Sequence, residues 1–130
     1  MTGAPWTFDE ARLKCLEASR RQEAAEDVLR QSYRDSAQSE EAYRVALADK
    51  IIDLRNDGVA ATACADIARG DRKVAALRVK RDIAEGVREA MSQAAWRLTA
   101  DRKDAQRFSD WSQRREMAET GHQPLEGSIA

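Results

Sequence analysis

The chain has 130 residues, of which 35% are charged, and its 22 basic and 23 acidic side chains leave a formal net charge of −1. This balance excludes a strongly cationic nucleic-acid binder and a strongly acidic DNA mimic. Alanine accounts for 24 residues, against 29 for Leu, Ile, Val, Met, Phe, Tyr and Trp together. The composition therefore argues against a large spherical core and favours long helices that bury narrow apolar seams.

The length predicts a single helical domain, residues 1–119, followed by a disordered tail, residues 120–130. No apolar run approaches the roughly 20 residues that span a bilayer, and the N-terminus lacks the pattern of a signal peptide. Cys15 and Cys64 have no CxxC spacing, so both are expected to be reduced and partly buried. These features predict a cytoplasmic protein that does not contact a membrane.

The first helix is predicted over residues 8–56. Thr7 and Glu10 form a capping-box pattern, in which each side chain accepts the backbone N–H of the other residue, and Trp6 is placed to pack on Ala11. No proline or glycine follows until Gly58. The start and the end of this helix are therefore both marked in the sequence.

The apolar seam of the first helix is expected in two sections. Leu13, Leu16, Val28 and Leu29 mark one section, and Tyr43, Leu47, Ile51 and Leu54 mark the other with helical spacing. Serines occupy positions 32, 36 and 39 between them, where the seam should run. We expect a break or bend near Ser36–Ser39, which would make the preceding residues an N-terminal helical extension.

Glycines and capping residues predict two further helices. Gly58 ends the first helix, Thr62 is expected to cap a short helix over residues 63–69, and Gly70 ends it. Asp71 then caps a long helix over residues 72–119. The expected fold class is all-α: a long antiparallel, coiled-coil-like helical hairpin with a short helix in its turn.

The second long helix carries more apolar residues than one partner helix can cover. Val74, Leu77, Ile83 and Val87 begin a stripe that continues to Phe108 and Trp111. We expect self-association into a homo-oligomer to cover the remaining face, with a partner protein as the alternative. The predicted oligomer or partner interface comprises Tyr43, Leu47, Ile51, Leu54, Trp96, Phe108 and Trp111.

Catalytic and metal-binding patterns are lacking. The only histidine, His122, lies in the predicted tail, which leaves none for a triad, a zinc site or a general base near neutral pH. The stretch DGVAATA does not match a phosphate-binding GxxxxGK[ST] loop. We expect no enzymatic activity, no cofactor and no bound metal.

Basic residues are concentrated at the turn and at the start of the second long helix. In an oligomer, one such cluster in each subunit would form a repeated basic rim that could follow a phosphate backbone. The competing interpretation is a solvated helix face, which the high charge content of the chain favours. The cluster consists of Arg69, Arg72, Lys73, Arg78, Lys80 and Arg81.

Two stretches, YRVALADKIIDLRNDG and the one from ARGDRKVAALRVKRD to ADRKDAQRF, resemble small helical proteins of tailed-phage recombination modules. Their layout is similar to that of the UvsY-type recombination mediators over residues 43–111. The resemblance implies an oligomer that binds single-stranded DNA, contacts a single-strand-binding protein and helps to load a recombinase. It also implies that Lys50, which follows Val45-Ala46-Leu47, contacts DNA.

Two functions are consistent with the sequence. The first is a nonenzymatic, oligomeric accessory protein of phage DNA recombination or replication that binds single-stranded DNA and assists recombinase loading. The alternative is a protein–protein interaction module, such as a phage inhibitor of a host defence complex or an assembly factor.

Overall fold

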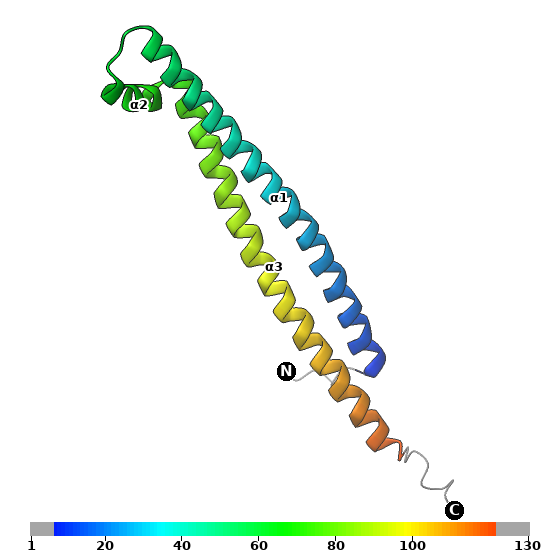
Figure 1. Cartoon of the computed structure of the whole chain (residues 1–130). Helices are drawn as coiled ribbons and strands as arrows, with labels where there is room; N and C mark the ends of the chain where they lie inside the picture. The colour runs from blue at the N-terminus through cyan, green and yellow to red at the C-terminus, as the bar shows by residue number, and fades with distance from the viewer. Residues whose placement is uncertain (1–6, 122–130) are drawn as a thin grey trace, which may run out of the picture. The chain divides into compact units, whose positions relative to one another are not determined.

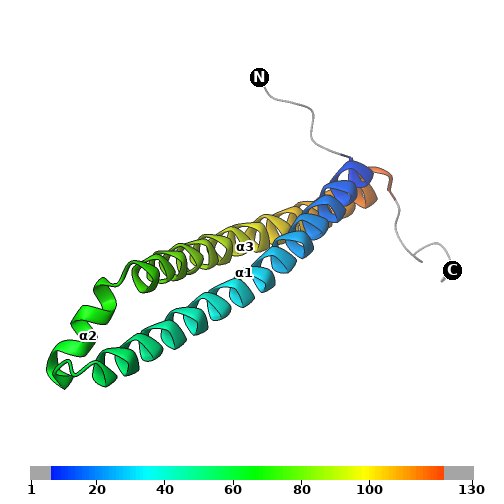
Figure 2. The same ribbon diagram turned by 90° about the horizontal axis from the view of Figure 1, so that it is seen from above.

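A computed structural model describes residues 7–121 of the chain. It contains three helices, α1 (Phe8–Asn56), α2 (Ala61–Gly70) and α3 (Arg72–Glu119), and no strand within these residues. Both views show α1 and α3 side by side (Figures 1 and 2). The predicted all-α helical hairpin is thus confirmed, with a short helix that begins two residues earlier than expected. Trp6 and most of the predicted tail lie outside the described residues.

The helices pack as two compact units. Unit 1 comprises residues 7–26 and 94–121 of the described range, and unit 2 comprises Asp27–Gln93, including α2. In unit 1, the backbone N–H of Phe8 donates to Glu116 Oε1 at 3.0 Å and Gln22 Nε2 donates to Thr99 Oγ1 at 3.1 Å. Residue numbers rise along α1 as they fall along α3, so the two helices are antiparallel. The expectation of one domain over residues 1–119 stays a prediction.

The predicted capping box begins α1. The backbone N–H of Thr7 donates to Glu10 Oε2 at 3.0 Å, and the backbone N–H of Glu10 donates to Thr7 Oγ1 at 3.2 Å. Two backbone donors at the helix N-terminus, which have no partner within the helix, are thereby satisfied.

Gly58 ends α1 with a positive φ of 86°. The N–H groups of Val59 and Gly58 donate to the carbonyls of Leu54 and Arg55 at 3.0 and 3.1 Å, which is the hydrogen-bond pattern of a Schellman motif. A side chain at position 58 would be strained in this left-handed conformation. Glycine is therefore required at this turn by backbone geometry.

The two other predicted caps have different outcomes. Asp71 Oδ2 accepts the backbone N–H of Val74 at 3.2 Å, as predicted for the start of α3. The cap assigned to Thr62 is wrong, because α2 begins at Ala61 and its N-cap, Ala60, makes no side-chain hydrogen bond. Thr62 is already inside the helix, where it cannot act as the N-cap.

The expected break near Ser36–Ser39 is also wrong, because α1 is a single helix from Phe8 to Asn56. Ser32, Ser36 and Ser39 are buried in unit 2 together with Tyr43. The hydroxyl of Ser32 donates to the carbonyl of Leu29 at 2.7 Å, which satisfies it within the helix. Serine therefore occupies the contact face of α1, and its small side chain allows α3 to approach closely.

Small residues form the seam of unit 1 as well. The buried positions there are Ala11 and Ala18 on α1 and Ala95, Ser109 and Ser112 on α3. Leu13, which we expected in the seam, is 60% exposed, and Leu16 and Val28 are also exposed. The sequence correctly predicted the helices, but the largest apolar side chains do not mark the face on which they pack.

We predict that Ser36→Leu destabilises the protein by roughly 1–3 kcal/mol, because the larger side chain overpacks a seam built for a small one. Ala37→Leu is the matched control, since Ala37 is the exposed neighbour of Ser36 on the same helix. Urea denaturation followed by circular dichroism measures both free energies of unfolding. Equal values for the two variants would contradict the packing role of Ser36.

Candidate interaction surfaces

Three of the seven predicted nucleic-acid-binding residues are engaged in ion pairs within the chain. Lys50 Nζ lies 3.7 Å from Asp71 Oδ1, and Arg69 Nη1 lies 3.4 Å from Asp66 Oδ1. Arg81 is the third. A phosphate group would have to compete with these carboxylates for the same cations.

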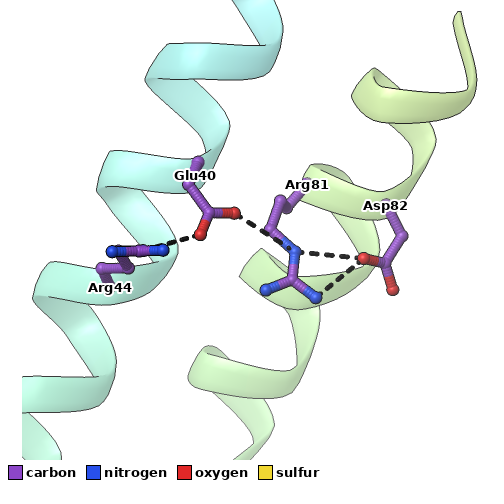
Figure 3. Close-up of polar contacts among 4 residues, drawn as sticks. All are labelled: Glu40, Arg44, Arg81 and Asp82. Carbon is purple, nitrogen blue, oxygen red and sulfur yellow. Dashed lines mark hydrogen bonds and ion pairs between the residues drawn. The ribbon is translucent and has the colours of Figure 1, made fainter. Parts of the chain in front are cut away.

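Arg81 links α3 to α1 (Figure 3). Its Nε lies 3.5 Å from Glu40 Oε2, and its Nη2 donates to Asp82 Oδ1 at 2.9 Å. Its guanidinium carbon lies 4.5 Å from the centre of the Tyr43 ring, a cation–π contact, and the side chain is only 23% exposed. Arg44 Nε donates to the other oxygen of Glu40 at 2.7 Å. These contacts assign Arg81 to helix packing.

Neighbouring carboxylates stabilise the charge of Arg81. The hydrogen bond to Asp82 raises the pKa of the guanidinium above its ordinary value, and the charges of Asp82, Glu40 and Glu85 raise it further, against a smaller opposing effect of desolvation. These neighbours therefore favour the charged form of Arg81 in the folded protein.

The other four predicted cations are exposed and make no ion pair within residues 7–121. Lys73 and Lys80 are seven residues apart and share one face of α3, whereas Arg78 is rotated away from Lys73 by roughly 140° at 3.6 residues per turn. The expected basic cluster is therefore divided between faces. Its unpaired members are Arg72, Lys73, Arg78 and Lys80.

An apolar groove runs between α1 and α3 on one face of unit 2, and we call it the unit 2 groove. Two adjoining hollows compose it, and both are lined by Gln38 and Ala42. Val45, Ile83 and Val87 are 54%, 62% and 46% exposed. Val45 lines one hollow, and Ile83 and Val87 line the adjoining hollow. The apolar lining consists of Ala42, Val45, Ala46, Leu77, Ile83, Ala84 and Val87.

The two walls of the unit 2 groove carry opposite charges. The wall formed by α1 contributes Asp35, Glu41 and Asp49, and the wall formed by α3 contributes Lys73 and Lys80. None of these five residues makes an ion pair with another described residue, although Asp35 accepts a hydrogen bond from Gln31. The groove thus has one acidic rim and one basic rim whose charges are unmatched.

The residues predicted to form an oligomer or partner interface fall into two groups. Tyr43 is buried between α1 and α3, and Leu47, Ile51 and Leu54 are half-buried in unit 2. In unit 1, Trp96 is 74% exposed, and the exposed rings of Phe108 and Trp111 lie 5.6 Å apart. Tyr43 is therefore committed to contacts within the chain, while the interface role of the others stays a prediction.

The described part of the chain offers no metal centre and no membrane span. Residues 7–121 contain no group of three or more His, Cys, Asp or Glu placed to bind a metal. Both cysteines are free, and the Cys64 thiol donates to the carbonyl of Val59 at 3.6 Å. None of the three helices has an apolar stretch that could cross a bilayer.

Comparison of the chain with protein families, with characterised proteins and with solved structures found no match. The resemblance to UvsY-type mediators accordingly stays a prediction.

The groove was not predicted from the sequence, because Ile83 and Val87 were placed in one apolar stripe together with Val74 and Leu77. A seven-residue repeat in the sequence of α3 could have identified the residues that face α1. Val74, Arg81 and Arg88 occupy one seam position, and Leu77, Ala84 and Met91 occupy the other. In that register, Ile83 and Val87 lie outside the seam.

We predict that Arg81→Glu lowers the melting temperature by several degrees, because the new carboxylate faces Glu40 and Asp82 and loses the contact with Tyr43. Arg78→Glu is the matched control, with the same change of charge at an exposed position that makes no ion pair among residues 7–121. Thermal melting followed by circular dichroism compares the two variants. If both melt at the same temperature, Arg81 is not a packing residue.

Proposed function

We propose that this chain is a helical protein–protein interaction module whose unit 2 groove receives another helical surface. One observation carries the proposal: the exposed aliphatic side chains of Val45, Ile83 and Val87 line an open groove between α1 and α3, whereas most of the buried contact positions hold alanine or serine. Exposed apolar surface next to charged rims is typical of protein interaction sites. An amphipathic helix is the natural partner of a groove between two helices.

The charges of the groove support the same function. Apolar contact provides affinity, whereas charged rims select the orientation of the partner and exclude wrong partners. Glu41 and Asp49 on one wall and Lys73 on the other line a single hollow without pairing with each other. A partner that pairs with both walls would therefore be recognised in one orientation.

We expect the double substitution I83E/V87E to abolish association with protein partners while the helical content is retained, because both side chains are exposed and Glu is a good helix former. R72E/R78E is the control, since both residues lie on α3 outside the groove lining. Nuclease-treated affinity capture with the full chain as bait measures the difference. Capture of the same proteins by wild type and by I83E/V87E would contradict the proposal.

Binding of single-stranded DNA, with assistance in recombinase loading, is a second candidate function. It is favoured by four cations that are exposed at the start of α3 and make no ion pair with another residue of the described range: Arg72, Lys73, Arg78 and Lys80. Unpaired cations of this kind bind a phosphate backbone in a salt-dependent manner. Assembly of several copies would multiply a weak site.

If the chain binds DNA, R72E/R78E should weaken binding to a fluorescent single-stranded oligonucleotide and I83E/V87E should not. Each lost phosphate contact reduces the magnitude of the negative slope of log K against log salt by about 0.7. Fluorescence anisotropy at low and moderate salt measures both quantities. No binding at high micromolar protein, or identical curves for wild type and R72E/R78E, would exclude DNA binding through these residues.

A further inference from the structure

We infer that the occupant of the unit 2 groove is a second copy of this chain, related to the first by a two-fold axis parallel to α1 and α3. The inference rests on the proposed function, because it identifies the helical surface that the groove receives. It is argued from the distribution of charge on the two walls.

The groove is self-complementary. The charged residues that line it are all acidic on α1 and all basic on α3. An isologous two-fold contact brings the same surface of both copies together, so each wall must find its complement on that same surface. A partner of uniform charge would pair with one wall and be repelled by the other, whereas a second copy supplies both signs.

The charges also select the symmetry axis. If two grooves face each other across an axis perpendicular to the helices, α1 meets α1 and α3 meets α3, which opposes like charges. If the axis is parallel to the helices, α1 of each copy meets α3 of the other, and acidic walls meet basic walls. Since like-charge contacts disfavour an interface, the parallel axis is favoured.

The register of the walls fits this axis. A rotation about an axis parallel to the helices leaves every residue at its own height along the bundle. Lys73 lines the same hollow as Glu41 and Asp49, and Lys80 lines the same hollow as Asp35. Each lysine therefore meets acidic residues of the second copy at its own level.

The arrangement also covers the exposed apolar residues. Val45, Ile83 and Val87 of both copies would lie between the facing helix pairs, which form a four-helix arrangement in which neighbouring helices are antiparallel. The lining of the groove extends from Ser32 to Asp49 on α1, a length of roughly 25 Å at 1.5 Å per residue. Burial of this apolar surface provides the affinity of the dimer, and the charged rims fix how the two copies are aligned along the helices.

Two matched charge reversals test the inference on the purified full chain. K73E/K80E makes both walls acidic. E41K/D49K replaces two of the three acidic residues of the α1 wall by lysine, so that both walls are then mainly basic. Each variant alone is expected to weaken self-association by about tenfold or more, because like charges then face each other across the two-fold axis. An equimolar mixture of the two should restore association as a heterodimer, since each acidic wall again meets a basic one.

Light scattering and sedimentation equilibrium measure the mass, with R72E/R78E as the control that leaves the groove unchanged. We expect wild type and control at twice the 14.6 kDa of one chain, each single-wall variant near the monomer mass, and the mixture at the dimer mass again. The recovery of the mixture shows that the variants are folded.

Three results would overturn the inference: a monomeric wild type, a self-association that neither charge reversal weakens, or a mixture that stays monomeric. A monomeric wild type whose protein partners are still lost in I83E/V87E would refute the second copy and leave the proposed function standing. Failure of the two proposals is therefore distinguishable.

Discussion

Close contact between α1 and α3 through small side chains is the constraint on which the other features of this protein depend. Alanine and serine at the buried seam positions bring the two backbones near each other. Few large side chains, chiefly Tyr43 and Val74, are buried in this contact, and many of the larger aliphatic and aromatic residues remain exposed. A composition rich in alanine and poor in large apolar residues thus produces a helix pair whose principal apolar surface is exposed.

Polar and cation–π contacts also link α1 to α3 across the seam. Arg81 crosses from α3 to Glu40 and Tyr43 on α1, and Arg88 lies 5.3 Å from the centre of the Tyr33 ring. Burying Ala and Ser removes less apolar surface from water than burying Leu or Ile, so each seam layer contributes little stability. A helix pair of this kind gains stability from whatever covers its outer face.

The packing of α1 against α3 also separates the basic residues that were expected to form one cluster. Apart from Lys50 they are close together in sequence, but they have different surroundings in the fold. Lys50, Arg69 and Arg81 pair with carboxylates, Arg72 and Arg78 are exposed outside the groove lining, and Lys73 and Lys80 line the groove. A cluster in sequence is therefore not a cluster on the surface. An acidic wall on α1 faces Lys73 and Lys80 across the groove. This wall could not be predicted from neighbouring positions in the sequence, because α1 and α3 meet only in the folded chain.

The sequence by itself determined the two long helices and the ends marked by Thr7 with Glu10, by Gly58 and by Asp71, because capping and chain reversal depend on neighbouring residues. It did not determine which face of each helix is buried. Ser36 was mistaken for part of a break, and Ile83 was not distinguished from the buried Val74 of the same stripe, since either residue type can occur on either face of a helix. Only the tertiary structure decided between these faces, because the seam is chosen by how closely two whole helices can approach, and that depends on residues far apart in the chain.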